Sequence, residues 1–177
     1  MRRGAGHVNV LALDLALATG WAIREGARTE SGVQLFETKR GESPGMRYIR
    51  FRRWLADVGA RTELIVYEQT IPVKKKFAGA SSRELAAGFA TRVQEFCAER
   101  GIEHTAVYPS VLKKFATGKG NADKLAMLEA VRRRWNPDVV NHNEADAIAA
   151  LEYALAEIVF HASSGRAGYC ATPSRSS

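Results

Sequence analysis

Two apolar segments of the sequence each end in an acidic residue. Asp14 lies near the end of the run 8–15, and Glu68 directly follows the apolar residues 64–67. A carboxylate in such a run is costly to bury unless it is paired or binds a metal ion. Each acid alone could instead mark the end of a strand, and Glu68 could pair with a nearby lysine. If both segments are strands of one sheet, their carboxylates can converge at the strand ends, where ligands gather.

A third acidic residue, Asp146, lies in a segment, 145–151, whose residues are nearly all apolar. Such a pattern predicts a buried helix. At about 100° per residue, Asn143 shares the side of Asp146, whereas Glu144 lies about 160° away and is not expected to join it. Alternatively, Asn143 caps the helix and Asp146 interacts with the helix dipole. The two interpretations are compatible.

Three carboxylates without a thiol ligand favour a hard cation, so we expect Mg²⁺, with Mn²⁺ as a possible substitute. A pair of such ions in one site can activate a water molecule and stabilise the leaving oxygen of a phosphodiester. The sequence thus predicts Asp14, Glu68 and Asp146 as metal ligands and catalytic residues, with Asn143 as a further catalytic candidate. The two cysteines indicate neither a disulfide framework nor a zinc site, which favours a reducing, intracellular location.

The chain is basic, with a net charge of +7, which favours a polyanionic partner. Its basic residues concentrate in the ranges 39–61, 72–83 and 113–134. Any one of these ranges could be an ordinary solvated surface. Three of them around an acidic site favour the backbone of a nucleic acid. The candidate DNA-binding lysines in the second and third ranges are Lys74, Lys75, Lys76, Lys113, Lys114, Lys119 and Lys124.

The hydrophobic pattern predicts one α/β domain over residues 8–161. The expected strands are 8–15, 20–23, 32–36, 64–68 and 104–107, and the expected helices begin near Ser43, Ser81, Pro109, Asn121 and Asn143. Three strands so close in sequence indicate an antiparallel meander, which alternating helices and strands then extend into a mixed sheet. We expect residues 1–7 to be a flexible leader and residues 162–177 to be disordered. No apolar run approaches the roughly 20 residues of a membrane span.

Four short motifs together resemble the RuvC-type Holliday junction resolvases, most closely their bacteriophage branch. The motifs are residues 13–15 with 19–21, residues 67–69, residues 113–124 and residues 143–147, in the family's order. Residues 113–124 are the most specific of them. The resemblance implies an RNase H-like fold, in which antiparallel strands 1–3 precede parallel strands 4–5 and helices flank the sheet. It also implies a cytoplasmic homodimer (in the host, if phage-encoded) that uses Mg²⁺ to nick four-way DNA junctions, leaving 5′-phosphate and 3′-hydroxyl ends.

The resemblance also assigns roles to single residues. The family's metal-binding acids and its basic positions near the scissile phosphate correspond to Asp14, Glu68, Asp146, Lys113 and Lys124. Asn143 stands where the family often has a fourth acid or a histidine, so one metal site is expected to differ in strength or metal preference. The family tends to have an aromatic residue just after the strand glutamate. Here Ile71 is near that position, and Phe77 is the closest aromatic substitute and hence a DNA-binding candidate.

Three other functions compete with a four-way-junction nuclease. A protein with the same features could bind branched DNA with weak or no cleavage. A broader nuclease could act on flaps and other branches. A nucleotide-binding relative of actin and the sugar kinases would also have a first strand that ends in Asp before a Thr-Gly turn, but that class normally needs two such domains, and 177 residues are too few for both.

Overall fold

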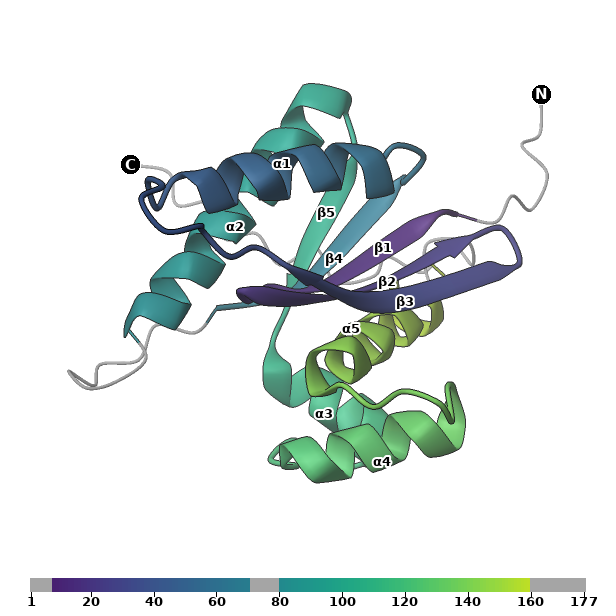
Figure 1. Ribbon diagram of the computed structural model, residues 1–177. Coiled ribbons are helices and arrows are strands. Elements are labelled where there is room, and N and C mark those ends of the chain that lie inside the picture. The colour runs from purple at the N-terminus through teal and green to yellow at the C-terminus, as the bar shows by residue number, and fades with distance from the viewer. Residues whose placement is uncertain (1–7, 71–79, 160–177) are drawn as a thin grey trace, which may run out of the picture.

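The computed structural model describes residues 8–70 and 80–159 (Figure 1). Its strands are β1 (Val10–Asp14), β2 (Ala18–Glu25), β3 (Arg28–Leu35), β4 (Leu64–Glu68) and β5 (Glu103–Val107). Its helices are α1 (Met46–Val58), α2 (Ala80–Arg100), α3 (Pro109–Thr117), α4 (Lys124–Arg134), α5 (His142–Tyr153) and the π-helical turn η1 (Ala154–Val159). The predicted leader, the predicted C-terminal tail and the candidates Lys74, Lys75, Lys76 and Phe77 lie outside the described residues.

The strands form one mixed sheet in the order β3-β2-β1-β4-β5. β1 and β3 each pair with β2 in antiparallel fashion, whereas β4 is parallel to both β1 and β5. This confirms the predicted α/β class, with an antiparallel meander followed by two parallel strands. Leu13 pairs with Tyr67, so the central strands β1 and β4 end side by side.

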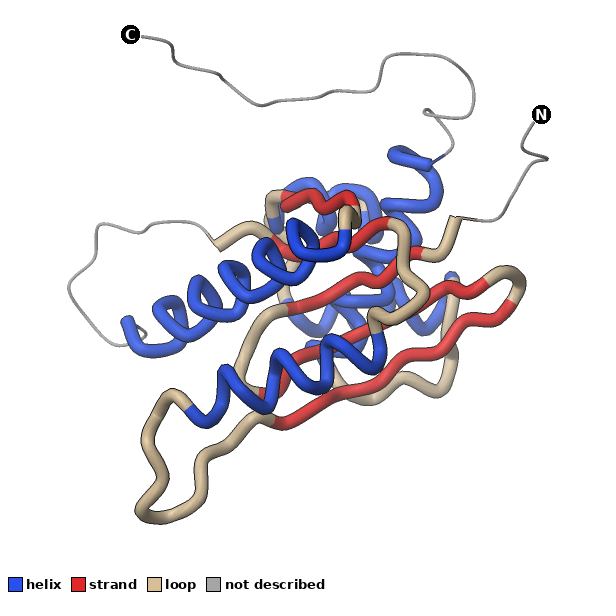
Figure 2. Tube along the Cα trace, turned by 90° about the horizontal axis from the view of Figure 1, so that it is seen from above, coloured by secondary structure: helices blue, strands red, loops and turns tan. Residues whose placement is uncertain are grey.

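Helices cover both faces of the sheet, with α1 and α2 on one face and α5 on the other, backed by α3 and α4 (Figure 1). Figure 2 shows α1 and α2 from above, lying over the strands. Side chains alternate along β1, so Leu11 and Leu13 pack in the core with Phe51 of α1 and Phe89 of α2, whereas Ala12 packs in the core beneath α5. Burial on both faces explains why β1 is a continuous apolar run.

Two helix starts differ from the sequence prediction by two residues. Asp123 caps α4 in place of Asn121, and its side chain accepts a backbone hydrogen bond at 2.8 Å. Asn141 caps α5 in place of Asn143 and accepts the Asn143 backbone N–H at 2.8 Å. Several Asn and Asp residues in these stretches can cap equally well, so spacing alone chose the wrong ones. Asp146 therefore lies beyond the first turn of α5, where the helix dipole acts most strongly, and a capping role does not account for it.

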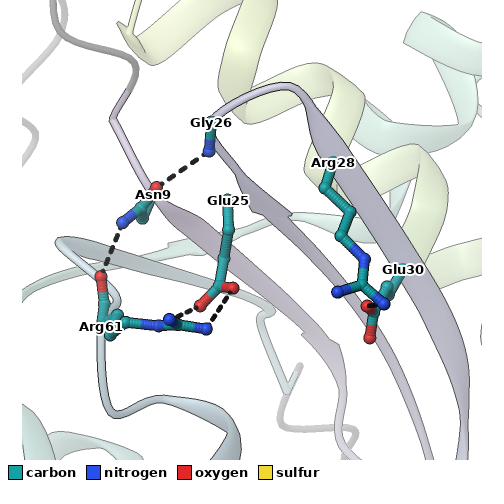
Figure 3. Close-up of polar contacts among 6 residues, drawn as sticks. All are labelled: Asn9, Glu25, Gly26, Arg28, Glu30 and Arg61. Atoms are coloured by element: carbon teal, nitrogen blue, oxygen red, sulfur yellow. Dashed lines mark hydrogen bonds and ion pairs between the residues drawn. The ribbon is translucent and has the colours of Figure 1, made fainter.

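The end of the sheet where β1 begins is fastened by polar contacts (Figure 3). The Asn9 side chain donates to the Arg61 carbonyl oxygen at 3.0 Å and accepts the Gly26 N–H at 3.1 Å. The Arg61 guanidinium pairs with Glu25 at 2.7 Å. These contacts join the β2–β3 turn to the chain before β4. They pair the charged groups of Glu25 and Arg61 with each other, at the end of β1 that lies away from Asp14.

Candidate metal centre

Asp14 and Glu68 are the last residues of β1 and β4. Because side chains alternate along a strand, they lie on the same faces as Ala12 and Val66 respectively, and both of those residues pack in the core beneath α5. Since β1 and β4 are parallel neighbours in register, the two carboxylates lie at one edge and on one face of the sheet.

The helix α5 crosses this face and brings Asp146 to the same place. It approaches β2 so closely that a Cβ at Gly20 would lie 1.9 Å from the carbonyl oxygen of Asn143. The Asn143 side-chain amide also donates to the Ala18 carbonyl oxygen at 2.7 Å. Glu144 instead accepts a hydrogen bond from β3 at 2.7 Å, as expected from its place on the helical wheel. The small residue at position 20 is thus what allows α5 to lie against the sheet.

The pKa values of the three acids show that they share one electrostatic environment. Burial, followed by the charges of Asp146 and Glu68, raises the pKa of Asp14 to about 8. Burial, followed by the charge of Asp146, raises the pKa of Glu68 to about 7. Burial also raises the pKa of Asp146 above its usual range. Like charges raise one another's pKa only at short range, so the fold brings together acids that are 54 and 78 residues apart in sequence.

Two of the lysines predicted to bind DNA lie beside the acids. The charge of Lys124, at the start of α4, acts to lower the pKa of all three carboxyl groups. Lys113, on α3, acts in the same direction on the pKa of Glu68 and of Asp146. Lys114 and Lys119 are exposed and are not among the charges that shift these pKa values. The structure therefore separates an inner pair of lysines from an outer pair.

His142 is a neighbour to which sequence reasoning assigned no role. Its Nδ1 lies 3.2 Å from the Lys124 carbonyl oxygen, and its charge acts to lower the pKa of Asp146. A carbonyl oxygen can only accept, so Nδ1 donates in this contact. This contact ties the start of α5 to the start of α4. The position of His142 beside Asp146 could have been predicted from the sequence, because residues four apart on a helix share one side.

The donor chemistry of the acids fits a divalent cation. Within residues 8–70 and 80–159, no hydrogen bond or ion pair engages the side-chain oxygens of Asp14, Glu68 or Asp146. In the same ranges, no three His, Cys, Asp or Glu side chains are arranged closely enough to hold a metal ion as they stand. Three adjacent carboxylates repel one another, and a dication would offset both that repulsion and the cost of burial. We therefore expect binding of an ion to draw the oxygens together.

A cavity of about 330 Å³ opens beside two of the acids, Asp14 and Glu68. The ends of β1 and β4 contribute Asp14 and Glu68 to its lining, and the first turns of α2 contribute Ser82 and Arg83. Pro109, at the start of α3, closes part of the boundary. Sequence reasoning placed Arg83 only within a basic range and at a helix start, because nothing in its neighbourhood in sequence indicates that α2 begins beside this cavity.

The sheet order, the flanking helices and the acids at the ends of the central strands define an RNase H-like α/β domain with a candidate metal centre. Among solved structures, the chain is similar to Thermus thermophilus RuvC in complex with a Holliday junction substrate, with a TM-score of 0.68 and 22% identity over 92% of this chain and 99% of that chain. A second T. thermophilus RuvC structure gives a TM-score of 0.65 and 21% identity over 91% and 99%. The yeast mitochondrial Holliday junction resolvase Ydc2 gives a TM-score of 0.52 and 12% identity, over 81% of this chain and 75% of that chain.

These likenesses confirm the RNase H-like fold that the motifs predict. No family model matches the chain, and no curated protein matches it in sequence. None of the helices in the described part of the chain is long and apolar enough to cross a bilayer.

Proposed function

We propose that this chain is a structure-specific DNA endonuclease that cuts four-way junctions by metal-assisted phosphodiester hydrolysis. One observation supports this above all: acids from β1, β4 and α5 meet at one edge of the sheet beside Lys113 and Lys124. The likeness to a RuvC that is bound to a Holliday junction substrate supports the choice of DNA structure.

In this proposal Asp14, Glu68 and Asp146 hold Mg²⁺, with Mn²⁺ as a possible substitute, at two ions per active site. When bound, the ions would activate a water to attack the phosphorus and would stabilise the departing 3′-oxygen. Breakage of the P–O3′ bond leaves 5′-phosphate and 3′-hydroxyl ends. Lys113 and Lys124 face the cut phosphate and offset its charge. These residues lie on separate elements, so the scissile phosphate is bound only where strand ends, α3, α4 and α5 meet.

Asn143 has a more limited part in the proposed chemistry. Its amide nitrogen donates to the Ala18 carbonyl oxygen, which leaves only the side-chain oxygen to accept from a water or to bind a metal ion. An amide oxygen adds no negative charge, so the ligand set has one negative charge fewer than a set with a fourth acid. We therefore expect weaker binding of one ion.

The DNA arms extend from the site over the basic surface. Lys114 and Lys119 are exposed and can contact phosphates outside the centre. The candidates outside the described residues, Lys74 to Lys76 and Phe77, are proposed to contact the junction as well. We further propose a homodimer with two active sites, one for each of two opposed strands, acting in the cytoplasm (that of the host, if phage-encoded).

Cleavage of a labelled synthetic four-way junction tests the proposal. Asp146→Asn should abolish nicking with Mg²⁺ or Mn²⁺ and retain junction binding, because it removes a metal ligand and leaves the basic surface intact. Asp138→Asn is the matched control, since Asp138 is exposed in the loop before α5. Unchanged nicking by the Asp146 variant would contradict the assignment of the centre.

The presence of Asn143 in place of an acid keeps a second candidate open, which is a protein that binds branched DNA without cutting it. Tight junction binding with no nicks across Mg²⁺ and Mn²⁺ would favour that function. Mapping cuts on four-way, three-way, flap and linear substrates separates a strict junction enzyme from a broader nuclease. Cuts confined to the four-way substrate support the proposal.

A further inference from the structure

The cavity beside Asp14 and Glu68 has both acidic and basic side chains in its lining. Asp14 and Glu68 come from the strand ends, and Ser82 and Arg83 come from α2. A phosphate bound at the two carboxylates through metal ions would therefore border the cavity that Arg83 and the Ser82 hydroxyl also line. No acidic side chain lies in the first turn of α2, so the helix dipole adds to the positive potential there.

Arg83 differs from most arginines of the described chain in having no internal partner. Six ion pairs engage Arg24, Arg28, Arg50, Arg52, Arg61 and Arg92. Arg132 and Arg134 donate to backbone carbonyl oxygens. Within residues 8–70 and 80–159, Arg83 makes no hydrogen bond, ion pair or ring contact, and it is exposed. Its guanidinium is free to bind a ligand in the cavity.

The size of the cavity indicates how much of a nucleic acid it can hold. Its volume of about 330 Å³ is at the lower end of the range of small-molecule sites, about 300–1,000 Å³. That is more than one phosphate group needs. Leu15, Ala86 and Pro109 give the lining an apolar part suited to a sugar or base. The cavity is therefore suited to one nucleotide unit next to the cut bond.

We propose that Arg83, assisted by the Ser82 hydroxyl, binds the phosphate that neighbours the scissile phosphate on the cut strand. A guanidinium matches phosphate geometry with two parallel N–H donors. The contact would fix the strand on both sides of one nucleotide and so set its position over the acids. This inference rests on the proposed function, since it takes the acids as the place where the strand is cut.

The test combines Arg83→Gln with junctions that have one neutral methylphosphonate, placed in turn on either side of the cut bond. Binding is measured by fluorescence anisotropy with Ca²⁺ in place of Mg²⁺, and cleavage separately with Mg²⁺. Arg83→Gln should weaken binding by roughly 10- to 150-fold, the range of one charge-assisted hydrogen-bonded contact. Arg83→Lys should recover part of the loss, because it keeps the charge without the paired donors.

The decisive result is the coupling between protein and DNA changes. One of the two methylphosphonates should weaken binding of the wild type by a similar factor and should cause little further loss with Arg83→Gln. Arg100→Gln, at the far end of α2 and about 25 Å away at 1.5 Å per residue, should remain as sensitive to it as the wild type.

The failures of the two proposals are distinguishable. If the wild type cuts junctions but losses from Arg83→Gln and from both methylphosphonates simply multiply, the role of Arg83 is wrong and the nuclease assignment stands. If the wild type binds without cutting, the binding cycle still tests Arg83. A wild type that does not bind junctions at all overturns both.

Discussion

Replacing Asp14 with Asn should stabilise the metal-free protein at neutral and alkaline pH, while removing most of its response to Mg²⁺. Burial and the neighbouring acids raise the pKa of Asp14 from 3.8 to about 8. Folding therefore favours the protonated carboxyl group. Its contribution to stability is fully present below about pH 4 and is lost as the pH rises through about 8. Asparagine has no charge to bury and avoids that loss.

The magnitude follows from the two pKa values of Asp14. A pKa difference from 3.8 to about 8 corresponds to at most roughly 6 kcal/mol, at 1.36 kcal/mol per pH unit. The side chain is only partly buried and borders a cavity, so water and side-chain rearrangement reduce the cost of the charge. We expect Asp14→Asn to raise the free energy of unfolding by about 1–3 kcal/mol at pH 8, and to change it little at pH 4.

Urea unfolding in EDTA at pH 4, 6 and 8 measures this difference. Asp138→Asn, at an exposed position, should show no such pH-dependent gain. Mg²⁺ at 100 times its dissociation constant should then stabilise the wild type by about 2.7 kcal/mol and Asp14→Asn by much less. The reasoning is refuted if Asp14→Asn is no more stable than the wild type at pH 8 in EDTA, or if the difference does not grow with pH.

Three further predictions concern groups around the acids. Lys124→Gln should slow junction cleavage by about 10²- to 10³-fold in single-turnover assays with the protein saturating the junction, because Lys124 influences all three acids. Under the same saturating conditions Lys119→Gln should cleave near the wild-type rate, because its proposed contact outside the centre affects binding and not the chemical step. Gly20→Ala should lower the free energy of unfolding by more than about 3 kcal/mol, since its Cβ would overlap the Asn143 carbonyl group. Thermal unfolding measures this loss. Gly45→Ala is the control, because its Cβ would have its nearest neighbour at 3.6 Å. Asn143→Ala should lower the free energy of unfolding by about 1–2 kcal/mol, because its hydrogen bond to β2 is lost. The variant should also need a higher Mg²⁺ concentration for half-maximal cleavage. The same Mg²⁺ dependence in the variant and the wild type would contradict a role near the ions.

The sequence contained strong signals for the central strands and for the acids that end them. A run such as 64–67 is apolar at consecutive positions because β4 is covered on both faces, and that pattern depends only on local burial. The same holds for the buried, alanine-rich α5, on which Asp146 was recognised as out of place. The helix caps were less predictable, since Asn121 and Asp123 have nearly equal capping tendencies and the choice depends on how α4 packs.

The type of each main element and the mixed sheet therefore followed from the sequence by itself, and the three acids stood out in it as candidates, because each has a pattern in nearby residues. Tertiary structure alone decided which side chains meet. It set α5 against Gly20, brought His142 to the Lys124 carbonyl oxygen and placed Arg83 in the lining of the same cavity as Asp14 and Glu68. Such encounters depend on the packing of elements that are far apart along the chain, and no local period or spacing in the sequence records them.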